Sequence, residues 1–245
     1  MAVTVAPERA EEARAAMLEL FPEGFEEAER PGGLELAAYT DSEGEDRLRG
    51  VFGAVAATEA PEDWAERWRS FHRGARVGAL WVGPPWEPPP ADATPVVVDP
   101  GRAFGTGGHP TTRLCLELLQ LAPRGSLLDV GCGSGVLAIA GALLGFEPVT
   151  ALDSDPAAVE ATGENARRNG VRLEARQADA LEGPLPETDV AVANITGEAL
   201  PFVPFRSTLV IASGYLAGDE IGLHGYVRAE RRTLDGWAAD LFRRH

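Results

Sequence analysis

The sequence predicts an α/β protein in which a small α+β domain precedes a mostly parallel, doubly wound, seven-stranded sheet whose last strand is antiparallel. Two observations predict the sheet. Between residues 96 and 212, apolar strand-like runs alternate with helical segments, an order typical of parallel βαβ units. The chain then ends in two strand-like runs joined by Asp235 and Gly236, a pair that is common in tight hairpin turns.

The small α+β domain is expected over residues 1–83. Apolar residues at helical spacing indicate a helix over 8–21, and a second helix over 61–71 begins with a proline and acidic residues. The strands of this domain are expected at 34–39, 49–55 and 79–82. Strands and helices mixed in this order are typical of a small α+β sandwich.

A proline-rich stretch follows this domain. Six prolines lie between Pro84 and Pro95, and so many residues without a backbone N–H exclude regular structure. We therefore expect a linker over 84–95 and a second domain over 96–245.

The elements of the second domain follow from its apolar pattern. After a strand at 96–98 and a glycine-rich loop at 101–108, Pro110 can open a helix, because proline is favoured in a first helical turn. Two further helices are expected at 136–144 and 156–168. The seven strands of the sheet are expected at 126–130, 149–152, 173–176, 190–193, 209–212, 227–233 and 237–242.

Composition disfavours several classes of protein. The formal net charge of −16 gives no basic footprint for direct binding to nucleic acid, disfavours anionic membranes and would attract a basic partner. No stretch approaches the length of a membrane-spanning helix, and the N-terminus lacks the pattern of a signal peptide. Cys115 and Cys132 do not have metal-binding spacing, so we expect no metal and a reduced, cytoplasmic setting. A monomer is favoured.

The strongest local signal is the glycine-rich turn LLDVGCGSG at 127–135, between an apolar strand and an apolar helix. Gly131 and Gly133 allow the backbone to turn sharply and to approach a ligand. Val136 stands where the dinucleotide-binding pattern has its last glycine. Asp129 at the strand end would repel a pyrophosphate and suits a cationic or amine-bearing ligand. The turn therefore favours S-adenosylmethionine over NAD.

Acidic residues at the ends of the next two strands extend this predicted site. Asp153 can accept hydrogen bonds from both hydroxyls of a ribose, whereas Asp155, which precedes a proline, is expected to cap a helix. Asp179 either reaches an adenine amino group or is an ordinary loop aspartate. We include Cys132 and Ser154, which adjoin the loop and the second strand, among the expected cofactor contacts.

Four motifs resemble the ribosomal protein L11 methyltransferase family. They are GRAFGTGGHPTT at 101–112, LLDVGCGSGVLAIA at 127–140, LDSDP at 152–156 and VANI at 192–195. The first motif is the most specific, because class I methyltransferases in general lack it. The resemblance runs in order from about residue 60 to the C-terminus, and residues 1–58 match only in the expected pattern of elements.

The resemblance implies a Rossmann-like class I methyltransferase domain preceded by a substrate-recognition domain. It implies that S-adenosyl-L-methionine is the methyl donor, and that the acceptors are lysine or N-terminal amines of a large-subunit ribosomal protein. The acidic composition agrees with a basic protein substrate that is free rather than embedded in RNA. Two alternatives stay open: methylation of another protein or a small-molecule amine, and a non-catalytic nucleotide-binding module.

The resemblance also implies roles for individual residues. By position, the cofactor contacts are Thr112, Gly131, Asp153 and Asn194. Residues 104–109, which include Phe104 and Thr106, would form a loop folded over the cofactor.

Two predictions concern the acceptor side of the site. Asn194 would orient the acceptor amine for an in-line displacement, and His109 would either act in catalysis or cap the helix that follows it. Thr196-Gly197-Glu198 departs from the family, which has an apolar residue after the motif. This departure bears more on the substrate than on the cofactor.

Overall fold

The computed structural model describes residues 1–6, 9–21, 26–30, 33–38, 42–53, 55, 73–99 and 107–245. The chain divides into two compact units, Met1–Arg69 and Ser70–His245. This division lies earlier in the chain than the linker that we expected at 84–95. The prolines instead lie in a loop within the second unit, because the strands on either side of the loop pair with each other in parallel.

The first unit contains a three-stranded antiparallel sheet and two helices. The strands are β1 (Ala2–Val5), β2 (Glu26–Arg30) and β3 (Gly33–Ala37), in the order β1-β3-β2. The helices are α1 (Ala10–Leu20) and α2 (Ser42–Phe52). The core includes the buried side chains of Met17, Phe21, Leu36 and Leu48. The predicted helix at 8–21 and the predicted strand at 34–39 are confirmed by α1 and β3.

The strand expected at 49–55 is wrong, because most of this stretch belongs to α2. Leu48 and Phe52 lie one helical turn apart and pack in the same core cluster. Arg49 donates hydrogen bonds to Glu45, also one turn away, at 2.6 and 3.0 Å. The apolar residues therefore follow a helical rather than an alternating pattern. The helix expected at 61–71 lies outside the described residues.

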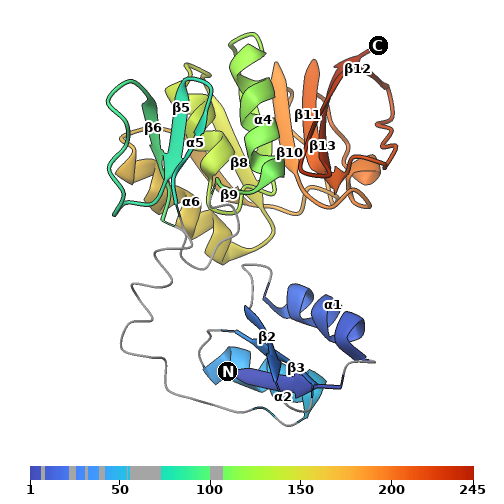
Figure 1. Ribbon diagram of the computed structural model, residues 1–245. Coiled ribbons are helices and arrows are strands. Elements are labelled where there is room, and N and C mark those ends of the chain that lie inside the picture. Colours follow the sequence, from blue (N-terminus) through green and yellow to red (C-terminus); the bar gives the residue numbers. More distant parts are fainter. Residues whose placement is uncertain are drawn as a thin grey trace. The chain divides into compact units, whose positions relative to one another are not determined.

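A seven-stranded sheet forms the centre of the second unit (Figure 1). Its strand order is β12-β13-β11-β10-β7-β8-β9. The strands are β7 (Leu127–Val130), β8 (Val149–Asp153), β9 (Glu174–Gln177), β10 (Val190–Asn194), β11 (Leu209–Leu216), β12 (Tyr226–Leu234) and β13 (Trp237–Arg244). β13 is antiparallel to both of its neighbours, β11 and β12. The predicted mostly parallel sheet with an antiparallel last strand is confirmed.

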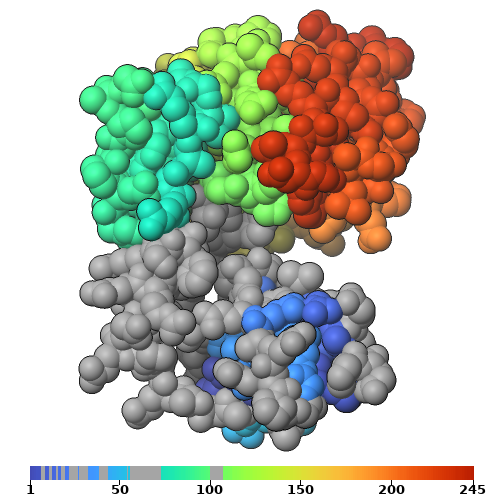
Figure 2. Space-filling model, viewed as in Figure 1, coloured from blue at the N-terminus to red at the C-terminus, as the bar shows by residue number. Residues whose placement is uncertain are grey.

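One face of this sheet carries all three α-helices that the structure describes in the second unit. They are α4 (Pro110–Leu121), α5 (Val136–Leu143) and α6 (Pro156–Arg168), close to the predicted bounds. A small sheet of β4 (Ala75–Val77), β5 (Leu80–Gly83) and β6 (Thr94–Val97) belongs to the same unit. In Figure 2, the green surface of α4 lies between this small sheet and the red terminal hairpin.

The opposite face is covered by irregular segments. The connections at 178–189, 195–208 and 217–225 contain one short 3₁₀ turn, η2 (Leu200–Phe202), and no α-helix. Their apolar residues nevertheless pack on the strands, with Leu185, Leu200, Val203 and Leu223 in one buried cluster. Within the ranges that the structure describes, no helix has the length and apolarity needed to cross a membrane.

Two asparagines on α6 and just after it connect this helix to the chain that leads into α4. Asn169 Oδ1 accepts a hydrogen bond from Val97 N at 2.8 Å, and its Nδ2 donates to Val97 O at 2.7 Å. Asn165 Oδ1 accepts from Asp99 N at 3.1 Å, and its Nδ2 donates to Ser134 O at 3.0 Å. Asn165 therefore ties the glycine-rich turn to the residues that precede 101–108.

The substitution Asn169→Ala tests this connection. It leaves the amide and carbonyl of Val97 without their side-chain partner, so we expect the free energy of unfolding to fall by about 1–3 kcal/mol. Urea denaturation of the full chain measures the change. Gln177→Ala is the control, since its exposed amide donates one bond to Ser154 O, and a change within about 0.5 kcal/mol is expected there. Equal losses in the two variants would contradict the role of Asn169.

Candidate functional site

The candidate site lies at the carboxyl ends of β7, β8 and β10, where the glycine-rich turn follows β7. Gly131, Gly133 and Gly135 have φ angles of 70°, 53° and 81°, in the left-handed region that favours glycine. A Cβ on Gly131 would overlap the side chain of Ile195, and one on Gly135 would lie 2.8 Å from Thr162 Cγ2. Both conformation and space therefore require glycine in this turn.

Asp153 at the end of β8 holds the turn. Its Oδ2 accepts a hydrogen bond from Gly133 N at 2.9 Å, and its Oδ1 accepts from Asp155 N at 3.0 Å. Asp155 in turn accepts from Ala157 N at 2.8 Å and is the N-cap of α6, which confirms the expected cap. The carboxylate of Asp153 thus connects two adjacent loops at the carboxyl edge of the sheet.

Asp129 is fully buried beside the turn. Its Oδ2 accepts a hydrogen bond from Ala138 N at 2.9 Å, while its Oδ1 has no partner among the described residues. Burial raises the pKa of Asp129 to about 7, and the nearby charge of Asp153 also raises it, against the effect of the Ala138 hydrogen bond. An unpaired buried oxygen costs free energy. A ligand that brings an amine or ammonium donor would satisfy it.

Cys132 lies in the turn as a protonated thiol. Burial raises its pKa to about 12, and its Sγ accepts a hydrogen bond from Thr162 Oγ1 at 3.2 Å. Because the thiolate is the reactive form of cysteine, this residue is a packing element rather than a nucleophile.

The structure brings Asn194 and Thr112 together, although they lie 82 positions apart. Asn194 Nδ2 donates to Thr112 Oγ1 at 3.3 Å, and Thr112 is fully buried in the first turn of α4. Among the described residues, none donates a hydrogen bond to Asn194 Oδ1. The amide oxygen of Asn194 can therefore accept a hydrogen bond from a ligand.

His109 is the N-cap of α4, which is one of its two predicted roles. Its Nδ1 accepts a hydrogen bond from Thr111 N at 3.4 Å and lies 2.7 Å from Thr111 Oγ1. Its ring makes an edge contact with Trp237, with ring centroids 4.9 Å apart. Burial lowers the pKa of His109, so the neutral imidazole is favoured at neutral pH. A catalytic role for His109 stays a prediction.

The structure describes two of the four remaining predicted cofactor contacts. Phe104 and Thr106 lie outside the described residues. Asp179 Oδ1 accepts a hydrogen bond from Leu181 N at 2.9 Å, as an ordinary loop aspartate would, and Ser154 is exposed beside the second strand. Contact with an adenine stays a prediction for Asp179.

Asn165 and Ile195 support the turn, although neither was among the site residues predicted from the sequence. A signal for Asn165 was present, since this polar residue stands on the buried stripe of α6 with Ala158, Thr162 and Ala166. Ile195 gave no such signal. Its packing against Gly131 depends on how the strands are ordered in the sheet.

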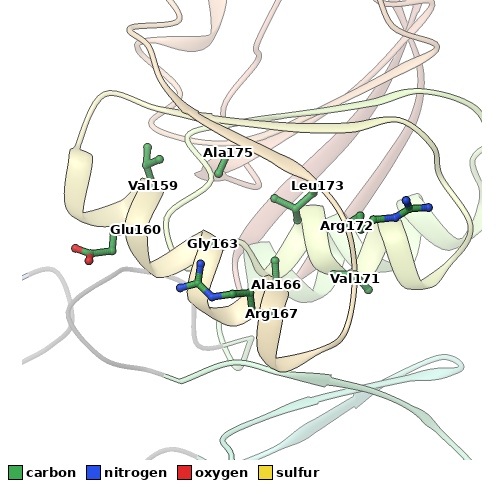
Figure 3. Close-up of a pocket in the computed structure, with 9 residues that line it drawn as sticks. All are labelled: Val159, Glu160, Gly163, Ala166, Arg167, Val171, Arg172, Leu173 and Ala175. Carbon is green, nitrogen blue, oxygen red and sulfur yellow. The ribbon is translucent and has the colours of Figure 1, made fainter.

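A separate groove lies at the sheet edge between α6 and β9 (Figure 3). The close-up shows the apolar side chains of Ala166, Leu173 and Ala175 along it, and the charged side chains of Arg167 and Arg172 also line it. None of the predicted site residues lines this groove. The candidate site is therefore the carboxyl edge of the sheet and not this groove.

Comparison with known proteins identifies a family whose members match the part of the chain that contains this edge of the sheet. The family model described as ribosomal protein L11 methyltransferase (PrmA) matches residues 33–218. This chain belongs to the ribosomal protein L11 methyltransferase family. The matched range includes the glycine-rich turn, Asp153 and Asn194, so the candidate site lies within the part of the chain that the family model matches.

Curated relatives and a solved structure agree with the family. The chain is 40% identical over 198 residues to the ribosomal protein L11 methyltransferase of Symbiobacterium thermophilum, a match that covers 74% of this chain and 65% of that protein. It is 46% identical over 166 residues to the one of Pseudomonas aeruginosa, covering 64% and 56%. The chain thus spans less than two thirds of the length of these relatives.

The solved structure is a ribosomal protein L11 methylase from Lactobacillus delbrueckii subsp. bulgaricus. It has a TM-score of 0.59 and 26% identity, and the match covers 71% of this chain and 100% of that chain. The Rossmann-like fold of the second unit is therefore the fold of class I methyltransferases.

The unpartnered oxygen of Asp129 gives a prediction about pH. A ligand with a cationic amine favours the charged carboxylate, so below the pKa of about 7 binding must also release a proton. We expect the affinity for S-adenosylhomocysteine to rise about tenfold from pH 6 to pH 8, as measured by calorimetric titration.

The Asp129→Asn variant controls for other titrating groups. It lacks the titrating carboxyl, so its affinity should change little over the same pH range. The same pH dependence in the variant and in the unaltered chain would contradict the role of Asp129.

Proposed function

We propose that this chain is an S-adenosyl-L-methionine-dependent N-methyltransferase acting on lysine or N-terminal amines of a large-subunit ribosomal protein. The observation that carries the proposal is the hydrogen bond between Asn194 and Thr112 at the edge that also carries the glycine-rich turn. It directs the amide nitrogen of Asn194 to α4 and leaves the amide oxygen for an acceptor amine.

The residues at the carboxyl edge of the sheet have the chemistry needed to bind S-adenosylmethionine. The glycines of the turn admit close approach of a ligand to the backbone, Asp129 offers an unpartnered oxygen to an amine, and Asp153 is a carboxylate at the tip of β8. A carboxylate at this place can accept hydrogen bonds from ribose hydroxyls. When bound, S-adenosylmethionine supplies an electrophilic methyl group on a sulfonium.

On the acceptor side, the chain has to hold a neutral amine in line with that methyl group. A free lysine has a pKa of about 10.4, and burial lowers such a pKa because it disfavours the charged form. Asn194 Oδ1 accepts a hydrogen bond from the amine and directs its lone pair. The neutral state of His109, whose pKa is lowered by burial, places no fixed charge near the end of α4.

Charge supports a basic protein as the substrate. The formal net charge is −16, and residues 1–70 contain 17 acidic residues against 7 arginines. Such a surface attracts basic proteins over a distance set by the ionic strength. We propose that the first unit recognises the substrate, and that the substrate is ribosomal protein L11, as in the names of the relatives.

A second candidate is methylation of another protein or of a small-molecule amine. The observation that favours it is the segment after Asn194, where Thr196 and Glu198 are exposed and an apolar residue was expected. Polar residues beside Asn194 suit a different acceptor. A non-catalytic nucleotide-binding role has no such support, because the negatively charged carboxylate of Asp129 would repel a bound pyrophosphate.

Methyl transfer distinguishes these candidates. Labelled S-adenosylmethionine is supplied to the full chain with unmethylated L11 of the source organism, and in parallel with an undermethylated lysate resolved by mass. Label in L11 supports the proposal. Label only in another protein or in small molecules supports the second candidate, and no label in either sample, despite cofactor binding, contradicts both.

Two substitutions separate the proposed roles of Asn194 and Asp153. Asn194→Ala should lower kcat by at least about tenfold, because the amine loses its orientation, while the Kd for S-adenosylhomocysteine changes little. Asp153→Ala should raise that Kd by about 10–100-fold, because hydrogen bonds to a charged group are lost. Steady-state kinetics and calorimetry measure the two effects. Equal loss of cofactor affinity in both variants would contradict this division.

A further inference from the structure

A cluster of charged and polar side chains lies on strands β11, β12 and β13, and β11 pairs with the strand that ends at Asn194. Asp240 on β13 is 0% exposed and accepts hydrogen bonds from Arg231 Nε and Nη2, both at 2.8 Å. The hydroxyl of Tyr215 on β11 shares its one proton between Asp240 Oδ2, at 3.1 Å, and Ala212 O, at 2.9 Å. A bidentate bond from a guanidinium to a buried carboxylate fixes the geometry of both partners. Tyr215 is therefore held in one place by β12 and β13.

The same cluster fixes the connection at 217–225. Arg231 Nη1 donates to Ala217 O at 3.2 Å, and its Nη2 donates to Asp219 O at 2.8 Å. Arg228 pairs with Glu220 at 2.7 Å. Ile221, in the middle of this connection, is thereby kept against the sheet, where it packs on the apolar cluster of that face.

The segment that follows Asn194 packs against the side chains of Tyr215 and Ile221. A Cβ on Gly197 would lie 3.0 Å from Tyr215 Cβ and 3.3 Å from Ile221 Cδ1, so no larger residue fits there without a shift. Gly214, which has a φ of 107°, leaves no room for a Cβ against the backbone of Ile195. β11 has an irregularity between Ser213 and Tyr215, where its register with β13 shifts. The path of residues 195–197 is thus set by Gly214 at this irregularity and by Tyr215.

We propose that Tyr215, held by Asp240 and Arg231, is a positioning residue for the acceptor side of the site. β10 pairs with β7 up to Ala193 and with β11 up to Asn194, which lies opposite Ser213, so the backbone of β10 is fixed to the end of the strand. Residues 195–197 continue directly from Asn194, and their path therefore shapes the surroundings of its side-chain amide. This proposal rests on the role proposed above for Asn194 in orienting the acceptor amine.

The positions of Thr196 and Glu198 follow from the same contacts. Both are exposed, whereas Gly197 between them faces Tyr215 and Ile221. The cluster therefore determines which way the two polar side chains point next to Asn194. Their polarity and placement contribute to the choice of acceptor amine.

The first test compares two tyrosines that each donate a buried hydroxyl to a backbone carbonyl. Tyr215→Phe removes the bonds to Asp240 and Ala212, and Tyr226→Phe removes a bond to Ser207 O of 2.7 Å. We expect Tyr215→Phe to lower kcat/KM for unmethylated L11 about fivefold, the effect of one hydrogen bond, with the Kd for S-adenosylhomocysteine within about twofold. Tyr226→Phe should leave both quantities within about twofold.

A second pair of variants tests the contact with Gly197. Gly197→Ala adds a Cβ against Tyr215 and Ile221, whereas Gly222→Ala adds one where no atom lies within 4 Å. We expect Gly197→Ala to lower kcat/KM for L11 by at least about fivefold and Gly222→Ala to leave it unchanged. Equal kinetics in the members of both pairs would overturn the proposal.

Hydrogen exchange gives a readout that does not require activity on L11. The amides of Ala199 and Leu200 both donate to Thr196 O, so their exchange reports on the segment after Asn194. With S-adenosylhomocysteine bound, Tyr215→Phe should speed this exchange by about fivefold, and Tyr226→Phe should not. Equal exchange in the two variants overturns the proposal. Loss of methyl transfer in the unaltered chain would instead overturn the proposed function.

Discussion

The site depends on one constraint, the left-handed backbone of the turn between β7 and α5. Three glycines make this turn possible, and the space that their missing Cβ atoms leave is occupied by neighbouring residues, with Ile195 beside Gly131 and Thr162 beside Gly135. Asp153 then fixes the turn through the amide of Gly133. β8, α6 and the segment after β10 therefore all take their places relative to this one turn, which relates the proposed cofactor side of the edge to the proposed acceptor side.

Most elements of the second unit could be predicted because their apolar runs are long and end in strong punctuation. Pro110 opens α4, Asp155 caps α6, and Asp235 and Gly236 both adopt positive φ in the last hairpin. The first unit was harder to predict. A strand was expected at 49–55, yet most of this stretch belongs to the 11-residue helix α2, in which pairs one helical turn apart, such as Glu45 with Arg49, stabilise the helical conformation.

Part of the candidate site could also be predicted, because some of its residues leave a local pattern in the sequence. Glycines that need positive φ and acidic residues at strand ends leave a pattern in the sequence, so Gly131, Gly133 and Asp153 could be proposed from it. Contacts made by tertiary structure leave none. The bond between Asn194 and Thr112, the packing of Ile195 and the unpartnered oxygen of Asp129 all depend on the order of strands in the sheet. For Asn194 and Thr112, resemblance to a family supplied what spacing could not.

The two faces of the sheet differ in how they can change during evolution. Helices α4, α5 and α6 cover the face that holds the glycine-rich turn, and there a change in length would shift a regular element. The other face is covered by irregular connections whose backbone is held by side chains, such as Tyr226 at Ser207 and Arg231 at Ala217. Loops of this kind accept insertions and deletions more readily than helices. On the proposed division of the site, the loop-covered face can therefore change in length with little effect on the turn that we propose binds the cofactor.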